Sequence, residues 1–261
     1  MSASPLPLIP SIPSSDPERR FGGIARLYGS HALARLQAAR VVVVGVGGVG
    51  SWAVEALARS AIGTLRIIDL DIVHESNVNR QLPALDGEFG RAKVEVLAER
   101  IGRINPACTV EAVEDFLTPE NAAGLLAGAD AVLDAIDNVR AKAALIACCR
   151  SAHLPLVVSG GAGGKQDPGR IRLSDLAQTE QDPMLAKLRQ RLRKEYGFPR
   201  DPARRFGIDC VWSPEPVLRP RSCAGDAGLN CAGYGASMCM TASFGLRAAA
   251  RLIERLSASG R

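Results

Sequence analysis

One ten-residue segment constrains the fold of this chain more than any other. Residues 41–44 are four consecutive valines, which is typical of a strand buried on both faces. A glycine loop follows at once, and residues 51–60 then have the composition of a helix. Glycine permits a tight turn close to a phosphate, and the helix N-terminus supplies unpaired N–H groups. The strand, turn and helix together predict a nucleotide site whose glycines are Gly45, Gly47, Gly48 and Gly50.

Strands and helices are expected to alternate through the first 165 residues. A helix is expected at 30–40. Further strands are predicted at 64–70, 109–113, 131–136 and 156–159, and helices at 91–104, 118–126 and 139–152. This alternation predicts an α/β, Rossmann-like fold with a doubly wound, mostly parallel sheet.

The second half is expected to form an irregular, basic C-terminal extension of that fold. An antiparallel edge strand is predicted near 170–173 and helices at 182–196 and 236–256, whereas Pro, Gly and Arg dominate 197–230. Residues 1–18 are expected to be a disordered tail, because Pro interrupts their apolar runs. The rest, 19–261, is expected to be a single domain, with 178–231 as a substrate-binding insertion.

Charge is distributed unevenly along the chain, although the net charge is only +5. Residues 1–150 contain 15 Lys and Arg against 17 Asp and Glu, whereas residues 151–261 contain 17 against 10. A basic second half is typical of proteins that bind a polyanion such as nucleic acid. A solvated basic surface would give the same pattern.

The pattern of the seven cysteines argues against a zinc site and against disulfides. No pair has CxxC spacing, and no secretory signal is apparent, so we expect reduced thiols in a cytoplasmic protein. Cys210 and Cys231 suggest a thioester or sulfur-transfer role, but their apolar neighbours favour buried, inert thiols. The uncharged stretch 229–246 is interpreted as loop and helix rather than a membrane span.

Several charged residues follow the predicted strands. Asp69 lies 19 residues after Gly50, where an acid can accept hydrogen bonds from a ribose. Arg80 and Lys93 come soon after it. Two cations beside a phosphate loop suit a triphosphate better than the pyrophosphate of NAD or FAD, although each could be a surface cation.

Asp137 follows the predicted strand 131–136. Ligands of open α/β sheets bind at the carboxyl ends of strands, so this carboxylate could hold Mg²⁺ against phosphate oxygens. It could equally be the N-cap of the following helix. Asp134 lies two residues earlier and could point to the same site or be an internal hydrogen-bonding partner.

Together these residues resemble the ubiquitin-activating-enzyme-like superfamily, the ThiF/MoeB group, over roughly residues 20–165. The resemblance implies ATP-dependent adenylation of a carboxylate with release of pyrophosphate, by a domain that is usually homodimeric. It implies that Arg80 and Lys93 contact ATP phosphates and that Asp137 binds Mg²⁺, and these three form the candidate catalytic set. The implied ATP site comprises Gly45, Gly47, Gly48, Gly50, Asp69, Asp71, Asn79, Arg80, Gln81, Lys93 and Asp137.

Two departures from the usual pattern of this superfamily narrow the choice of branch within it. Members that activate sulfur carriers usually have two CxxC pairs and an arginine that crosses to the partner subunit; here Gly23 stands in its place, leaving Arg20 or Arg26 as substitutes. Residues 21–29, 160–164, 181–183, 207–211 and 233–245 resemble instead the tRNA threonylcarbamoyladenosine dehydratase branch. That resemblance implies a modified adenosine beside the tRNA anticodon as substrate. ATP would activate its threonyl carboxylate, and ring closure would expel AMP, with net loss of water.

The predicted helix 182–196 combines an apolar stripe of three leucines, Leu185, Leu188 and Leu192, with many cations. We expect this helix and the following loop to contact tRNA phosphates, with a solvated basic face as the alternative. The candidate tRNA contacts are Lys187, Arg191, Lys194, Arg204 and Arg205.

Other functions stay open on sequence alone. The first is an adenylyltransferase for a ubiquitin-like sulfur-carrier protein. An NAD-binding oxidoreductase and a non-catalytic nucleotide-sensing scaffold belong to other classes. Sulfur-relay proteins and a monovalent cation are further candidate partners.

Overall fold

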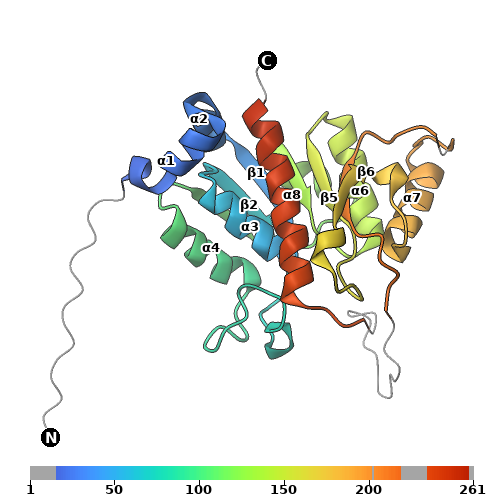
Figure 1. Cartoon of the computed structure of the whole chain (residues 1–261), viewed down its shortest axis with the longest axis horizontal. Coiled ribbons are helices and arrows are strands. Elements are labelled where there is room, and N and C mark those ends of the chain that lie inside the picture. The colour runs from blue at the N-terminus through green and yellow to red at the C-terminus, as the bar shows by residue number, and fades with distance from the viewer. Residues whose placement is uncertain (1–15, 202, 219–233, 259–261) are drawn as a thin grey trace, which may run out of the picture.

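The computed structural model describes residues 16–201, 203–218 and 234–258 (Figure 1). They form a seven-stranded sheet in the order β3-β2-β1-β4-β5-β7-β6, in which only β6 is antiparallel to its neighbour. The strands are β1 Arg40–Val44, β2 Thr64–Ile68, β3 Thr109–Val113, β4 Ala131–Asp134, β5 Leu156–Ser159, β6 Arg172–Asp175 and β7 Asp209–Trp212.

Helices cover both faces of this sheet. The buried residues of α2, α3, α4 and α8 form one apolar cluster, and those of α5, α6 and α7 form another. Figure 1 shows α8 (red) lying across the sheet beside α3. The helices are α1 Pro17–Tyr28, α2 Ser30–Ala38, α3 Gly50–Arg59, α4 Lys93–Ile104, α5 Ala122–Leu125, α6 Val139–Ser151, α7 Pro183–Glu195 and α8 Met238–Ala258.

The central strand β1 explains why the valine run was informative. Val41 and Val43 belong to one apolar cluster, whereas Val42 and Val44 belong to the other. All four are at most 2% exposed. Side chains of a strand alternate between faces, so a strand covered on both sides is apolar throughout. The predicted Rossmann-like, doubly wound, mostly parallel sheet is confirmed.

Several predicted boundaries were wrong by two residues or more, and two of them have a clear local cause. The helix expected at 118–126 spans only α5, because the side chains of Thr118 and Asn121 each accept a hydrogen bond from the other's backbone N–H. That closed turn delays the helix to Ala122. At the N-terminus, Asp16 caps α1, so residues 16–18 are ordered, whereas 1–15 of the expected tail lie outside the described residues.

The largest correction concerns 197–230, which was expected to be irregular. Strand β7 forms within it and pairs with β5 in parallel, and the predicted edge strand β6 then pairs with β7. Asp209 fastens β7 to α8, since its carboxylate lies 2.6 Å from Arg251 and 2.7 Å from Arg255. A four-residue strand between Gly and Pro has too few residues to show a period in the sequence.

Helix α8 packs directly on the start of α3. A Cβ added at Gly245 would lie 2.3 Å from the carbonyl oxygen of Val49, so glycine is required there. The C-terminal helix therefore reaches the glycine loop. None of the helices in the described ranges is long and apolar enough to cross a membrane.

Candidate nucleotide-binding site

The glycine loop fits closely between β1 and β4. Gly45 has φ +81°, and a Cβ there would lie 2.9 Å from the carbonyl oxygen of Ala135. A Cβ on Gly50 would lie 1.8 Å from the carbonyl oxygen of Gly45. Only glycine satisfies both positions. Helix α3 begins at Gly50, and the N–H groups of Ser51 and Ala53 donate to the carbonyls of Gly47 and Val49. An anion at this helix end would therefore meet the N–H groups of the loop that leads into α3.

Asp69 joins the end of β2 to this loop. Its carboxylate accepts hydrogen bonds from the N–H of Val46 at 2.7 Å and from the N–H of Asp71 at 2.9 Å. Burial raises the pKa of Asp69, and the charge of Lys93 opposes that rise. The acid predicted to bind ribose thus lies at the loop.

Lys93 is not a surface cation. Its ammonium lies 2.8 Å from the carboxylate of Asp71, and its side chain is 4% exposed. The backbone N–H of Lys93 also donates to the carbonyl of Asp71, at the first turn of α4. The structure thus brings Lys93, Asp71 and Asp69 together at the carboxyl end of β2.

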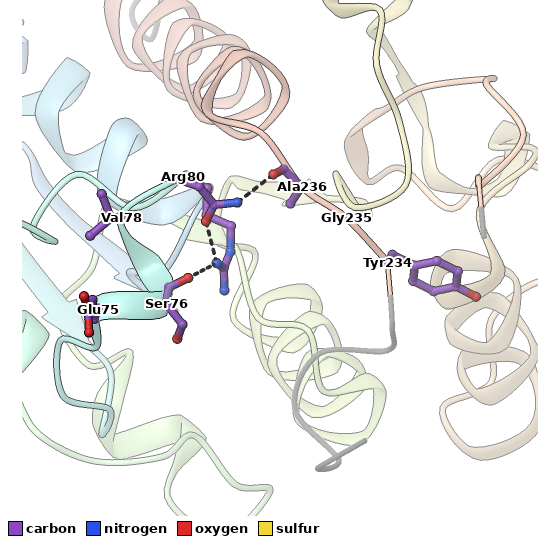
Figure 2. Close-up of a pocket in the computed structure, with 8 residues that line it drawn as sticks. Glu75, Ser76, Val78, Arg80, Tyr234, Gly235 and Ala236 are labelled. Atoms are coloured by element: carbon purple, nitrogen blue, oxygen red, sulfur yellow. Dashed lines mark hydrogen bonds between the residues drawn. The ribbon is translucent and has the colours of Figure 1, made fainter. Parts of the chain in front are cut away.

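Arg80 lies on the other side of the loop. A Cβ on Gly48 would be 3.5 Å from Cγ of Arg80. The guanidinium donates to the carbonyl of Ser76 at 2.9 Å and to the side chain of Asn79 at 3.0 Å, while Asn79 donates to the carbonyl of Ala236 (Figure 2). A cavity of about 430 Å³ opens here, lined by Glu75, Ser76, Val78, Asn79, Arg80, Tyr234, Gly235 and Ala236.

Gln81 lies beneath the loop, with its amide nitrogen 3.6 Å from the position of a Cβ on Gly47. Its Oε1 is a buried atom without a hydrogen-bond partner among the described residues. The loop admits no Cβ at Gly45 or Gly50, and with the nearby cations this fits an anionic nucleotide. The unpaired Oε1 of Gln81 is an acceptor, so it could receive only a hydrogen-bond donor.

The two interpretations of Asp137 can now be separated. The N-cap of α6 is Asn138, whose side chain accepts from the N–H groups of Arg140 and Ala141. Asp137 is exposed, directly after β4. Its carboxylate oxygens suit Mg²⁺. No group of three or more metal-binding side chains occurs in the described ranges, so phosphate and water would complete such a site.

Asp134 is an internal partner rather than a ligand-binding residue. Neither it nor Lys142 is exposed, and the ammonium of Lys142 lies 2.9 Å from its carboxylate. Burial raises the pKa of Asp134, and the charge of Lys142 opposes this rise. Sequence reasoning missed Lys142, although a lone lysine within the apolar run of α6 was a usable signal.

Trp52 and Thr241 were also missed. The indole N–H of Trp52 donates to the carbonyl of Arg80 at 3.0 Å. The hydroxyl of Thr241 lies 3.3 Å from this carbonyl and 3.3 Å from that of Ser237, so the two share its one proton. Thr241 also packs against Gly48. Nothing in the sequence indicates these contacts, because α3 and α8 are far apart along the chain.

Helix α7 has the predicted apolar stripe, since Leu185, Leu188 and Leu192 are fully buried. Asp182 caps this helix and also accepts a hydrogen bond from the N–H of Gly161, after β5. The helix therefore begins at the carboxyl edge of the sheet. A cavity of about 440 Å³ lies on its outer side, lined by Ala186, Arg189, Gln190, Arg193, Lys194 and Arg200.

The predicted tRNA contacts do not all lie at this cavity. Lys194 lines the cavity, whereas Arg191 pairs with Glu195 at 3.0 Å. The other three candidates, Lys187, Arg204 and Arg205, are exposed outside the cavity lining. Sequence reasoning did not select Arg189 as a tRNA contact; its guanidinium donates a hydrogen bond to the hydroxyl of Thr179.

Two remaining expectations concern cysteine and arginine. Burial raises the pKa of the Cys210 thiol, which is fully enclosed, as an inert thiol requires. Cys231 lies outside the described residues. Arg20 donates to the carbonyl of Ile104 at 2.8 Å, at the end of α4, whereas the guanidinium of Arg26 packs beside Gly22.

Comparison with known proteins extends over most of the chain. It is 51% identical over 244 residues to the tRNA threonylcarbamoyladenosine dehydratase of Haemophilus influenzae, covering 92% of this chain and 94% of that protein. The Escherichia coli dehydratase in complex with ATP has a TM-score of 0.87 at 47% identity, with 95% and 98% of the two chains covered. The same enzyme in complex with AMP has a TM-score of 0.87 at 48% identity, with the same coverage.

The match to a family is equally extensive. The model of the ThiF family matches residues 22–258, which include the glycine loop, the cavity beside Arg80 and both α7 and α8. The chain belongs to the ThiF family.

Proposed function

We propose that this chain uses ATP to dehydrate threonylcarbamoyladenosine beside the anticodon of tRNA, through an acyl-adenylate of the threonyl carboxylate. One observation carries the proposal: a loop that admits no Cβ at Gly45 or Gly50 adjoins Asp69, Arg80 and the end of β4. The similarity to tRNA threonylcarbamoyladenosine dehydratases supports it, because that similarity covers the second half as well as the glycine loop.

In this mechanism the protein acts mainly by positioning and by charge. The N–H groups of the glycine loop that leads into α3 and the guanidinium of Arg80 hold phosphate oxygens, and Asp69 accepts from the ribose hydroxyls. Lys93 adds positive charge to the same edge. Bound Mg²⁺, held by Asp137, would neutralise the phosphate charge. These groups stabilise the charge that develops when the threonyl carboxylate attacks the α-phosphate and pyrophosphate leaves.

Ring closure needs no nucleophile from the protein. The carbamoyl group and the activated carbon belong to one molecule, so proximity lowers the barrier, and AMP is a good leaving group. The buried thiol of Cys210 is consistent with a route that avoids a thioester. The chemistry balances with ATP and tRNA, so sulfur-relay proteins and a monovalent cation are not part of the proposal.

The tRNA would lie against α7 and the loop that follows it. The cavity on α7 is lined by four cations and no carboxylate: Arg189, Arg193, Lys194 and Arg200. Burial lowers the pKa of Arg189, and the charge of Arg193 lowers it further. A phosphodiester would relieve that repulsion, so we assign this cavity to the tRNA backbone. A tRNA substrate also fits the expected cytoplasmic location.

A homodimer completes the proposal. The crossing arginine of the family is replaced by Gly23, and Arg20 is engaged at the end of α4. Arg26 is therefore our candidate for reaching the partner subunit. An Arg26→Ala variant should lose adenylation in the dimer while it retains its own fold.

The decisive test uses purified protein, ATP, Mg²⁺ and threonylcarbamoylated tRNA. Digested nucleosides should lose the mass of one water, as measured by mass spectrometry, and Asp137→Ala should abolish that loss. A sulfur-carrier adenylyltransferase would instead exchange pyrophosphate into ATP only when a diglycine-tailed protein is added. Retention of the unchanged nucleoside with functional tRNA and ATP would refute the proposal.

A further inference from the structure

The peptide just before Asp137 is held from two sides by one buried ion pair. The N–H of Ile136 donates to the carboxylate of Asp134 at 3.0 Å, and the ammonium of Lys142 donates to the carbonyl of Ile136 at 3.0 Å. Lys142 and Asp134 are themselves 2.9 Å apart and fully buried. Both backbone polar groups of Ile136 are therefore fixed by the same pair.

The residue after Asp137 is fixed as well. Asn138 caps α6, and its carbonyl accepts from the backbone N–H of Lys142 at 2.9 Å. Lys142 thus contacts the chain on both sides of Asp137, with its ammonium before it and its N–H after it. Asp137 itself is exposed. Its direction is set by its two neighbours rather than by its own side-chain packing.

The same segment touches the glycine loop. A Cβ on Gly45 would lie 2.9 Å from the carbonyl oxygen of Ala135 and 3.1 Å from the nitrogen of Ile136. The backbone segment after β4 that carries Asp137 is therefore in contact with the loop expected to hold phosphate. A small shift at Ile136 would move the carboxylate relative to that loop.

We propose that Lys142 and Asp134 are positioning residues that hold the Asp137 carboxylate at the metal–phosphate position. This inference rests on the proposed role of Asp137. Stability alone does not explain the pair, since a buried ion pair can often be replaced by apolar residues without loss. One oxygen of Asp134, Oδ2, even lacks a hydrogen-bond partner among the described residues. Groups behind a metal ligand commonly set its orientation and the affinity of the metal.

The test replaces the whole pair, because removing one partner would leave a buried charge. In Asp134→Leu/Lys142→Met, thermal unfolding should stay close to that of the parent, and ATP affinity measured by calorimetry in EDTA should not change. The increase in ATP affinity on adding Mg²⁺ should need about tenfold more metal. Unaltered metal dependence in this folded variant would overturn the inference.

Two further variants make the result specific. Lys142→Arg keeps the buried cation but changes its shape, so it should fold even if the Asp134→Leu/Lys142→Met variant does not. It should also show weaker metal dependence. Parental metal dependence in Lys142→Arg would count against the positioning role of the pair. Asp137→Ala separates the two proposals. If Asp137→Ala leaves the effect of Mg²⁺ unchanged, the proposed role of Asp137 fails. If only the variants of Lys142 and Asp134 leave that effect unchanged, the positioning role of the pair fails and the role of Asp137 stands.

Discussion

The indole nitrogen of Trp52 donates a 3.0 Å hydrogen bond to the backbone carbonyl of Arg80. Helix α3, which starts at the glycine loop, therefore also holds the segment that brings Arg80 beside that loop. The hydroxyl of Thr241 on α8 also lies within hydrogen-bond distance of this carbonyl. Three elements far apart in sequence converge on one peptide group, and this convergence fixes where the cation lies.

The first prediction concerns that contact. Trp52→Phe removes the N–H donor while keeping an aromatic ring, so it should raise the KM for ATP severalfold. The hydrogen bond itself should contribute about 1 kcal/mol to the free energy of unfolding. Trp212→Phe is the matched control, because its indole donates to Ser174 on the neighbouring strand. It should lose comparable stability with no change in KM; equal KM values for both variants would contradict the prediction.

The second prediction tests the glycine loop. Gly50→Ala places a Cβ 1.8 Å from a backbone carbonyl, so the loop must move and ATP binding measured by calorimetry should be lost. Gly102→Ala, within α4, meets no atom within 4 Å and should stabilise the protein by about 0.5–1 kcal/mol. ATP binding by Gly50→Ala at parental affinity would exclude this loop from the site.

The third prediction concerns the pH dependence of ATP binding. Burial raises the pKa of Asp69, and Lys93 opposes that rise. Ribose hydroxyls donate to the ionised carboxylate, so ATP affinity should fall as pH decreases through this raised pKa. Lys93→Met removes the opposing charge and should shift the midpoint of that fall to higher pH. Lys93→Arg retains the charge and is the control, because ATP itself protonates in the same way with both variants. Identical pH midpoints for Lys93→Met and Lys93→Arg would refute the assignment.

The fourth prediction concerns stability through the strand that sequence analysis missed. Burial raises the pKa of Asp209, but hydrogen bonds from Arg251 and Arg255 outweigh it and leave the pKa lowered. Asp209→Asn should therefore cost about 1–2 kcal/mol of unfolding free energy at neutral pH.

A lowered folded pKa means that the contribution is complete above the unfolded value, about 3.9. It is lost as pH falls further, through the folded value. The difference between Asp209→Asn and the parent in urea unfolding should shrink below about pH 4. Exposed Asp86→Asn serves as the control and should differ little at any pH. A difference that persists in acid would show that packing, rather than charge, holds β7 to α8.

The fifth prediction concerns tRNA. Lys194→Glu reverses a charge in the cavity on α7 and should weaken tRNA binding about tenfold at low salt, and less at high salt. Arg19→Glu makes the same charge change on α1, at the opposite end of the molecule in Figure 1, where the side chain is 87% exposed. Fluorescence titrations of tRNA at two salt concentrations compare the two variants. Equal losses of tRNA affinity in both would indicate only an effect of net charge.

The sequence by itself determined the local parts of this protein. The valine run, the glycine spacing and the acid after β2 each depend on residues close together in the chain, and local backbone preferences suffice to fix them. The apolar stripe of α7 is likewise a property of one helix. These features predicted the sheet and the position of the nucleotide loop.

Tertiary structure decided what depends on distant partners. Strand β7 exists because β5 offers a free edge for pairing, and Asp134 is an internal ion-pair partner because α6 brings Lys142 to it. The sequence left Asp137 as either a Mg²⁺ ligand or the cap of α6, and the folded chain uses Asn138 as that cap instead. Burial, pairing and pKa shifts arise from groups that meet only in the folded chain, so no local pattern encodes them.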